Sequence, residues 1–331
     1  MNILITGAGS VMGQSLFRAA NYSKYAANMT VFFTNSEPEP AGFHFDSTGF
    51  YKTKFGGNFI VPVAKDAAYI PAIKKICADC KIDLVFGGTE HEIYALAHLQ
   101  EEVDFKLKIT GLPLKFTNIT TDKLKLGDFF SAHGIGQPAT DLFSNARDFV
   151  ARYGFPIIAK PRSNSSSRNI VVVKNEADFA RVNFALPENI VVQEYIGNEN
   201  EEYTCGCYLD FISSRESAIV MRRTLTLDGA SGYGEVVKDK IIEDYCSSII
   251  KAFKKNGLEG GAFNVQLRLQ DGQPLAFEIN GRYSSTEGPR ARLGFNAVEA
   301  TIENYLFGRA YDGFSPQIGG RFRRYYEEVY W

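Results

Sequence analysis

The stretch 263–282 most constrains the fold of this chain, because it has the alternation of a two-stranded β-hairpin. In FNVQLRLQDGQPLAFEINGR, the large apolar side chains occupy odd positions in both arms. Side chains alternate between the two faces of a strand, so a shared apolar face requires odd positions to pair with odd ones. We therefore predict a three-residue loop, Gln270-Asp271-Gly272, with Gly272 in the left-handed conformation.

The opposite face of this hairpin gathers polar side chains that suit a metal ion and an anion. Glu278 and Asn280 are two residues apart, so both point to one side, roughly 6–7 Å apart along the strand. One carboxylate with neighbouring amide oxygens suits Mg²⁺, which takes few protein ligands and keeps phosphates in its coordination, and Gln266 shares this face. Arg282, one step further, offers a planar guanidinium to a phosphate or carboxylate. The alternative is a half-buried hairpin whose polar face only meets water.

Length and composition restrict the class of protein. A chain of 331 residues exceeds one ordinary core, so two or three domains are expected. Its 45% hydrophobic and 22% charged residues are typical of soluble globular proteins, and the net charge of −2 argues against nucleic-acid or membrane-surface partners. The start, MNILITGAGS, lacks the features of a signal peptide, and no run reaches the roughly 20 apolar residues of a membrane helix. We expect a cytoplasmic protein.

The N-terminal segment predicts a βαβ unit with a glycine-rich first turn. An apolar strand at 2–6 precedes GAGSVMG and a helix to residue 20, and a second apolar strand covers 30–34. The glycine spacing differs from the dinucleotide motif, and the second strand ends in Thr34-Asn35-Ser36, with no acidic residue there to bind a ribose. Two interpretations remain: the glycines permit a tight turn and close helix packing, or the turn binds NAD.

A second glycine turn follows the predicted strand 83–86. In GGTEHE, Thr89 and Glu92 have the spacing of a capping box for the next helix. Open α/β sheets bind ligands at the carboxyl ends of their strands. Glu90 and His91 are therefore candidate substrate-site residues, and the alternative is that they are ordinary cap and surface residues.

The middle of the chain contains a candidate phosphate-binding loop. Lys160 ends a predicted strand, and the polar segment RSNSSSRN at 162–169 leads to the next strand at 170–173. Small residues with hydroxyls and backbone N–H groups between strands can surround a phosphate, and a lysine just before them adds positive charge. The alternative is a serine-rich hairpin tip without a ligand. The candidate loop residues are Ser165, Ser166 and Ser167.

From about residue 120 to 308, the order of these motifs resembles the ATP-grasp superfamily, most closely its carbamoyl-phosphate-synthetase-like branch. The segments that carry the resemblance are Thr121-Asp122-Lys123, Ala159-Lys160-Pro161, Gln193-Glu194-Tyr195-Ile196, Glu202-Tyr203-Thr204, Asn264-Val265-Gln266 and Glu278-Ile279-Asn280-Gly281-Arg282. The resemblance implies an α/β protein, with an N-terminal Rossmann-like domain before an ATP-grasp fold of two α+β subdomains. The implied boundaries are 1–113 for the N-terminal domain, 114–192 for a linker helix and lid subdomain, and 193–331 for the C-terminal catalytic subdomain.

The resemblance also implies three groups of ligand-binding residues. The ATP-binding group is Lys123, Lys160, Ser165, Ser166, Ser167, Glu194, Ile196 and Glu202, and the metal-binding group is Gln266, Glu278 and Asn280. The substrate group consists of Arg290 and Arg292, to which Glu90 and His91 are added from their position after the strand 83–86. In the first group, the lysines and serines would contact phosphates, Glu194 and the Ile196 backbone the adenine, and Glu202 the ribose. Lys160 and Arg282 would also act in catalysis. Many relatives carry an acid in place of Gln266, which leaves Glu278 as the only carboxylate of the metal-binding group.

The activity implied by the resemblance is an ATP- and Mg²⁺-dependent ligase, with Mn²⁺ as an alternative ion. It would convert a small-molecule carboxylate into an acyl phosphate, release ADP and phosphate, and join the acyl group to an amine. A homodimer is an allowed assembly. Two alternatives stay open: a non-catalytic nucleotide-binding protein on the same fold, and an NAD-dependent oxidoreductase built on the N-terminal unit.

Overall fold

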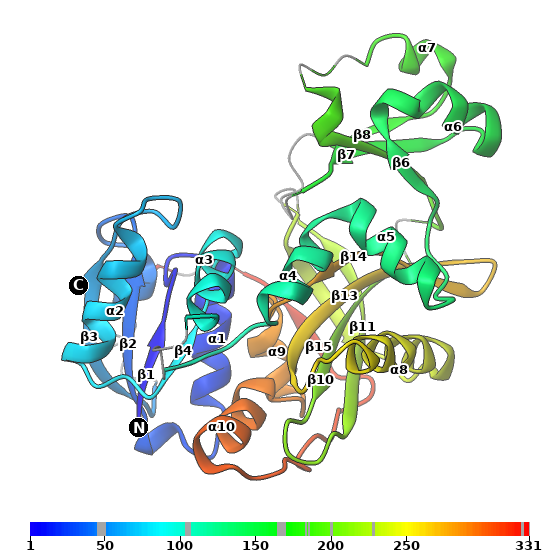
Figure 1. The fold of residues 1–331 in the computed structure, drawn as a ribbon. Helices are drawn as coiled ribbons and strands as arrows, with labels where there is room; N and C mark the ends of the chain where they lie inside the picture. The colour runs from blue at the N-terminus through cyan, green and yellow to red at the C-terminus, as the bar shows by residue number, and fades with distance from the viewer. Residues whose placement is uncertain are drawn as a thin grey trace.

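The computed structural model contains one parallel and two antiparallel sheets, which follow one another along the chain (Figure 1). The structure describes residues 1–44, 51–102, 107–163, 170–182, 184, 186–198, 201–226, 229–325 and 328–330. None of the helices in these ranges is both long and apolar enough to cross a membrane.

The N-terminal sheet is parallel, with strand order β3-β2-β1-β4-β5. Its strands are β1 (Asn2–Ile5), β2 (Thr30–Asn35), β3 (Lys54–Ile60), β4 (Leu84–Phe86) and β5 (Lys108–Ile109). The helices between them are α1 (Val11–Asn21), α2 (Tyr69–Asp79) and α3 (Glu90–Gln100). The predicted βαβ unit is confirmed, because β1 and β2 are parallel neighbours joined through α1.

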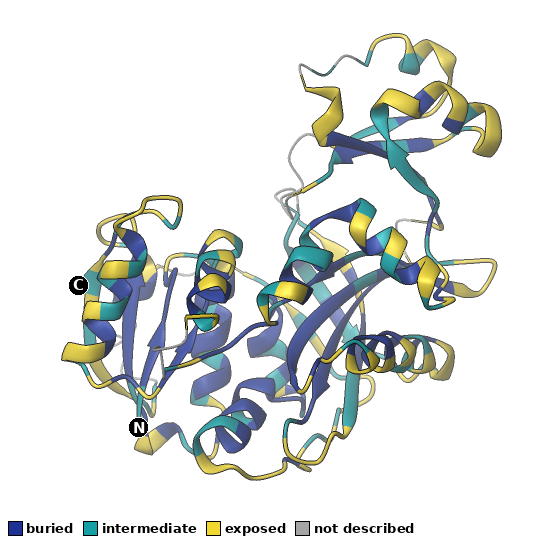
Figure 2. Ribbon diagram, viewed as in Figure 1, coloured by how far each residue is buried: buried dark blue, intermediate teal, exposed yellow. Residues whose placement is uncertain are grey.

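A four-stranded antiparallel sheet stands away from the rest of the molecule in Figure 1. Two helices, α4 (Leu114–Thr121) and α5 (Lys123–Ala132), lead to it. Its order is β6-β9-β7-β8, and the elements are β6 (Thr140–Leu142), α6 (Ala146–Tyr153), β7 (Ile157–Pro161), β8 (Val171–Val173), α7 (Glu176–Phe179) and β9 (Ile190–Glu194). Figure 2 shows that α6 and α7 are mostly exposed, and the buried core of this unit comes from β7, β8, β9 and one side of α6.

The third sheet is six-stranded and antiparallel, with order β14-β13-β10-β11-β12-β15. Its strands are β10 (Glu202–Leu209), β11 (Glu216–Leu225), β12 (Ser231–Val236), β13 (Gly261–Gln270), β14 (Gln273–Asn280) and β15 (Arg321–Arg323). The accompanying helices are α8 (Lys240–Lys255), α9 (Glu287–Arg292) and α10 (Ala297–Phe307). Odd residues of β10, such as Cys205 and Cys207, share a core with α8, so even residues such as Thr204 face the other side.

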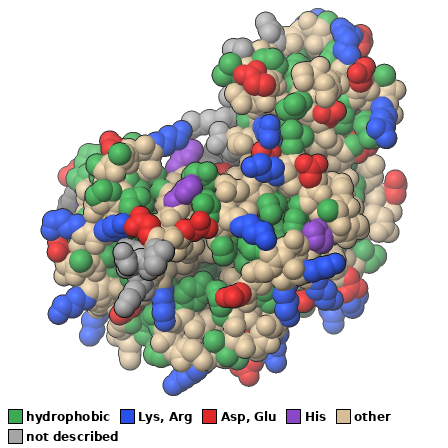
Figure 3. All heavy atoms as spheres, in the orientation of Figure 1, with side chains coloured by type: hydrophobic (Ala, Val, Ile, Leu, Met, Phe, Trp, Pro, Cys, Tyr) green, Lys and Arg blue, Asp and Glu red, His purple; other side chains and the backbone are tan. Residues whose placement is uncertain are grey.

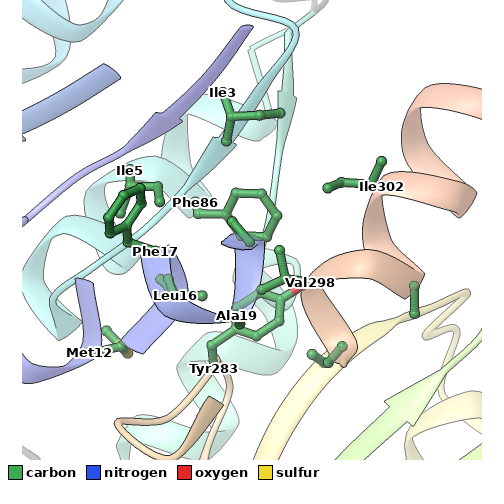
Figure 4. Packing of buried hydrophobic residues seen from close by; sticks show 14 of the residues in the cluster. Ile3, Ile5, Met12, Leu16, Phe17, Ala19, Phe86, Tyr283, Val298 and Ile302 are labelled. Atoms are coloured by element: carbon green, nitrogen blue, oxygen red, sulfur yellow. The ribbon is translucent and has the colours of Figure 1, made fainter. Parts of the chain in front are cut away.

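One hydrophobic core joins the N-terminal sheet to the C-terminal part of the chain (Figure 4). Leu16 and Ala19 of α1 lie close to Tyr283 and to Val298 of α10 in this view, and all four are buried. The N-terminal sheet is therefore packed directly against the region that carries the hairpin. This packing brings the loop after β4 near the end of β14.

The hairpin loop differs from the prediction. Gln270 pairs with Gln273, so the loop has two residues, Asp271 at φ 51° and Gly272 at φ 74°. Two left-handed residues in succession form the turn that suits a two-residue hairpin, and Asp-Gly is a preferred sequence for it. The predicted three-residue loop is wrong.

A β-bulge makes the two-residue loop compatible with the polar pairing. Gln266 pairs with Glu278 but Leu267 pairs with Ala276, so Phe277 is an extra residue in β14. Beyond the bulge, Gln266 pairs with Glu278 and Asn264 with Asn280, so the predicted gathering of polar side chains on this face is confirmed, in a register that the predicted loop did not give. On the turn side of the bulge, Ala276 is the residue of β14 that is buried in the core. The alternation predicts Leu275 and Phe277 there, and both are only partly buried.

Candidate functional site

A cavity of about 340 Å³ lies between the four-stranded and the six-stranded sheets. It brings together seven of the predicted site residues, which are Lys123, Lys160, Glu194, Ile196, Glu202, Gln266 and Glu278. A second, narrower recess is lined by Glu90, Asn280 and Arg282, and also by Lys123 and Glu278. Because two residues line both spaces, the cavity and the recess adjoin. The predicted loop residues Ser165, Ser166 and Ser167 lie outside the described residues.

The charges that line the cavity favour a polyanion. Its cationic side chains are those of Lys123, Lys160, Arg223 and Arg268, and its carboxylates are those of Glu194, Glu202 and Glu278. The chain as a whole carries a net charge of −2, and the face seen in Figure 3 mixes both signs. Among the described residues, four basic side chains thus line this cavity against three carboxylates, an excess of basic groups that the overall composition does not show.

The two lysines predicted to contact phosphate are both buried. Lys160, 5% exposed, donates to the Phe277 carbonyl oxygen at 3.3 Å, and its Nζ lies 5.4 Å from the centre of the Phe277 ring. Burial, with the nearby charge of Lys123, lowers the pKa of Lys160 to about 7. Burial also lowers the pKa of Lys123, which the charges of Glu278 and Glu90 partly oppose. A bound polyphosphate would favour the charged form of both lysines.

Lys160→Met is expected to stabilise the ligand-free protein below pH 7, by on the order of 4 kcal/mol. The folded state holds Lys160 at a pKa of about 7, against 10.5 ordinarily, so between these values the unfolded chain binds more protons. The wild-type protein therefore gains stability as the pH rises from 7 to 10.5, and the variant lacks this gain. Chemical denaturation at pH 6, 8 and 10 tests it, and an advantage of Lys160→Met that does not shrink with pH would contradict it.

Glu202 forms an ion-paired centre at the base of the cavity. Its Oε1 accepts from Arg223 Nη2 at 2.7 Å and Nε at 3.0 Å, and its Oε2 accepts from Arg268 Nη2 at 2.8 Å and Nε at 3.1 Å. Glu202 is 4% exposed, so both of its oxygens are occupied inside the protein. Its predicted contact with a ribose stays a prediction, whereas its role in fixing two cavity arginines is visible here.

Sequence reasoning missed Arg223 and Arg268 as site residues. Arg268 is two residues after Gln266 on β13 and therefore shares its polar face, so the alternation of the sequence could have indicated it. Arg223 lies on β11, opposite Glu202 in the antiparallel pairing, and only the strand order reveals that neighbourhood. Both arginines lie on the face of the sheet that lines the cavity.

The walls toward the four-stranded sheet suit a flat ring. Ile158, Val172 and Ile196 contribute apolar surface, and the Arg268 guanidinium lies 5.4 Å from the Tyr195 ring and 5.9 Å from the Phe277 ring. The Glu194 carboxylate also lines the cavity. Its Oε2 accepts from the Ala139 backbone N–H at 2.6 Å, where it ties β9 to the segment that enters the sheet.

The proposed metal ligands differ in how their oxygens are used. Gln266 Oε1 accepts from Arg223 Nη2 at 2.7 Å, and its amide nitrogen faces Glu278 Oε1 at 3.3 Å. The predicted ligation by Gln266 is therefore not supported by this arrangement, because a cation needs the oxygen. Asn280 Nδ2 donates to Glu278 Oε1 at 2.9 Å. The carboxylate of Glu278, which lines both spaces, and the amide oxygen of Asn280, which lines the recess, fit Mg²⁺, because this ion binds with few protein ligands.

The structure brings Glu90 of the predicted substrate group together with Arg282, which was predicted to act in catalysis, and separates the other three members of that group. Glu90 and Arg282 both line the recess, whereas His91 is exposed and is not among the described residues that line it. The Arg292 guanidinium lies 5.9 Å from the Tyr22 ring, on the side of α1. The predicted substrate contacts of His91 and Arg292 are thus not supported by their positions.

Arg290 is a structural centre and not a surface ligand. It is 0% exposed, pairs with Glu287 at 2.8 Å, and donates to Asn264 Oδ1 at 2.6 Å and to Thr204 Oγ1 at 3.0 Å. A Cβ atom at Gly206 would lie 2.9 Å from its guanidinium carbon, so the glycine makes room for it. The predicted substrate contact of Arg290 is wrong in this arrangement, because no ligand reaches a fully enclosed side chain.

The glycines of the first turn serve close packing. A Cβ atom at Gly13 would lie 2.3 Å from the Gly7 carbonyl oxygen, and in the neighbouring turn after β4 one at Gly88 would lie 1.8 Å from the Thr6 carbonyl oxygen. The Glu92 carboxylate lies beneath Gly7, and burial raises its pKa. The close approach predicted for this turn is confirmed.

Two family models match the chain after residue 119. One, described as a RimK-like ATP-grasp domain, matches residues 120–207, and the other, described as ATP-grasp in the biosynthetic pathway with Ter operon, matches residues 187–317. The large chain of carbamoyl phosphate synthase from Thermoplasma acidophilum is 25% identical over 263 residues, which are 76% of this chain. D-alanine–D-alanine ligase from Campylobacter jejuni is 24% identical over 220 residues, which are 62% of this chain. The chain spans 24% and 62% of the length of these two relatives.

Solved structures share the whole fold at low sequence identity. N5-carboxyaminoimidazole ribonucleotide synthetase from Thermus thermophilus has a TM-score of 0.71 at 14% identity, covering 96% of this chain and 81% of its own. The biotin carboxylase domain of 2-oxoglutarate carboxylase from Hydrogenobacter thermophilus, solved with MgADP and bicarbonate, has a TM-score of 0.72 at 15% identity, covering 94% and 70%. Together, the two ATP-grasp family models match residues 120–317 of the chain.

Proposed function

We propose that this protein is an ATP- and Mg²⁺-dependent ligase that activates a small-molecule carboxylate as an acyl phosphate and joins it to an amine. The observation that carries the proposal is the cavity in which, among the described residues, four basic side chains meet Glu194, Glu202 and Glu278, the last of which is hydrogen-bonded to Asn280. Relatives with this fold are named as ligases and carboxylases, and one was solved with MgADP. The domain boundaries near residues 113 and 192, the Rossmann-like character of the N-terminal domain and a homodimeric assembly belong to the same proposal.

Different residues of the cavity would bind the adenine, the phosphates and the Mg²⁺ ion. The apolar walls with Ile158 and Ile196 would hold the adenine ring, and Lys123 and Lys160 would neutralise the phosphates. Glu278 and Asn280 would hold Mg²⁺, which supplies further positive charge to the phosphate oxygens when bound. Arg223 and Arg268, kept in place by Glu202, add two fixed positive charges that need no reorganisation during the reaction.

The proposed reaction runs in two displacements. A carboxylate oxygen of the substrate attacks the γ-phosphorus of ATP, the bond from that phosphorus to the β,γ-bridging oxygen breaks, and ADP leaves. The amine nitrogen then attacks the acyl carbon, phosphate departs, and the nitrogen loses a proton. Arg282 in the recess would hold oxygens of the carboxylate during the first step.

Mg²⁺ with ADP is expected to raise the melting temperature, whereas NADH is not. Ligand at 100 times its dissociation constant adds about 2.7 kcal/mol to the free energy of unfolding. Thermal melts with Mg²⁺-ADP, with ADP and EDTA, and with NADH make the comparison. Stabilisation by NADH without any by Mg²⁺-ADP would favour the oxidoreductase alternative and contradict the proposal.

Turnover separates the ligase from a non-catalytic nucleotide-binding protein. Hydroxylamine is a general amine that traps acyl phosphates as hydroxamates, so it replaces the unidentified second substrate. ADP release that depends on an added carboxylate supports the ligase. Tight Mg²⁺-ADP binding without ADP release under any carboxylate would favour the non-catalytic alternative.

A further inference from the structure

The recess beside the cavity is a small space with an unusual lining. Glu90 begins α3, three threonines belong to α4, and Glu278 and Arg282 come from β14 and the segment after it. Its volume of about 20 Å³ accommodates one water-sized group. The recess is therefore shaped for the end of a ligand, with the rest of that ligand at its mouth.

The threonines of α4 present hydrogen-bond acceptors to this recess. Thr117 Oγ1 donates its proton to the Leu112 carbonyl oxygen at 2.8 Å. Thr120 and Thr121 donate theirs to the Thr117 carbonyl oxygen at 3.3 Å and 2.8 Å. A hydroxyl has one proton and two lone pairs, so these oxygens have only lone pairs left for a ligand. The wall is thus suited to a group that donates.

The charges around the recess differ from end to end. Glu90 adds a carboxylate from the start of α3. It lies near enough to Lys123 for its charge to oppose part of the lowering of the Lys123 pKa by burial. Arg282, at the end of the hairpin, adds a guanidinium. A purely anionic substrate would be repelled by Glu90, whereas a substrate with one positive and one negative end matches both charges.

We propose that the carboxylate substrate is a zwitterion, namely an amino acid. Its ammonium group donates to Glu90 and to threonine hydroxyls in the recess, and its carboxylate faces Arg282 and the side of Lys123 where the phosphates lie. An ammonium group is water-sized and has only donors, as the lining requires. This inference rests on the proposed ligase function and names its substrate class.

A simpler role for Glu90 would be to hold Lys123 in place for ATP. The two roles differ in what Glu90→Gln changes. If Glu90 only positions Lys123, the variant alters the affinity for Mg²⁺-ADP and leaves substrate preference as it was. If Glu90 binds the ammonium, the variant raises the KM for the amino acid roughly 10- to 100-fold, the range of a hydrogen bond to a charged group, with little change in ADP affinity.

The experiment measures ADP release and hydroxamate formation with Mg²⁺-ATP and hydroxylamine. Three pools are compared: the twenty L-amino acids with D-alanine, the carboxylic acids of the same skeletons without the amino group, and bicarbonate. Wild-type protein, Glu90→Gln and the control Glu101→Gln are assayed. The control neutralises an exposed carboxylate at the other end of α3. Calorimetric titration of Mg²⁺-ADP accompanies each variant.

We expect turnover with the amino-acid pool, little with the other two, and loss of this preference in Glu90→Gln alone. Equal turnover with the amino-free acids or with bicarbonate would overturn the inference and leave the ligase proposal standing. A Glu90→Gln variant that changes only ADP affinity and keeps the preference would overturn it too. Turnover with none of the pools, despite tight Mg²⁺-ADP binding, would contradict both.

Discussion

Glu278→Gln is expected to lower carboxylate-dependent ADP release on the order of 100- to 1,000-fold while the protein stays folded. Glu278 supplies the only carboxylate beside Asn280 among the proposed metal ligands, and an amide oxygen is a weaker partner for a hard cation. The side chain is half-buried and the apolar face of the hairpin is untouched, so the free energy of unfolding should change by about 1 kcal/mol or less. Steady-state ADP assays at saturating Mg²⁺, with thermal melts, measure both effects.

The matched control is Glu259→Gln, which neutralises an exposed carboxylate just before β13. It should leave the rate and the melting temperature near those of the wild type. A near-normal rate for Glu278→Gln would show that the polar face of the hairpin only meets solvent, as the alternative interpretation holds.

Glu202→Ala is expected to cost about 3–5 kcal/mol of stability, because it leaves two arginines without their carboxylate. The Arg223 side chain is 8% exposed and that of Arg268 is 16% exposed, so water replaces little of the lost interaction. Urea denaturation at neutral pH measures the loss. Mg²⁺-ATP should recover part of it, since its phosphates would partly neutralise the same arginines.

Glu235→Ala is the comparison for this second prediction. Glu235 also joins two arginines, Arg222 and Arg321, each at 2.9 Å, but both of these side chains are at least half exposed. Solvated ion pairs contribute little to stability, so its loss should be much smaller. Equal losses in the two variants would show that the centre in the cavity is no more consequential than a surface pair.

In the hairpin, the alternation of apolar and polar residues predicts the polar face correctly and the loop length incorrectly. That Gln266 and Glu278 share one polar face follows from alternation and is found, whereas their direct pairing does not follow from the predicted loop. The loop does not follow, because parity was applied across the whole hairpin and a bulge at Phe277 changes parity halfway. Asp271-Gly272 is itself a strong signal for a two-residue loop, so local turn chemistry was the better guide there.

The candidate site could be predicted where a side chain's role depends on its own strand or helix. Lys123, Lys160 and Glu278 are found together in the cavity as the motif order implied. Arg223 could not be found this way, because its importance comes from β11 lying next to β10. The prediction for Arg290 fails for a different reason. A charged residue in a polar loop suggests exposure, and only the packing of α9 on the sheet reveals that the Arg290 side chain is enclosed.

The central claim is that the cavity activates a carboxylate by transfer of the γ-phosphate of ATP. Phosphorus NMR of the wild-type protein with Mg²⁺-ATP, hydroxylamine and the carboxylate pools tests it most directly, because the products identify the bond that breaks. The account predicts ADP and inorganic phosphate in equal amounts, formed only when a carboxylate is present. AMP with pyrophosphate, or an unchanged ATP spectrum with every pool, would contradict it.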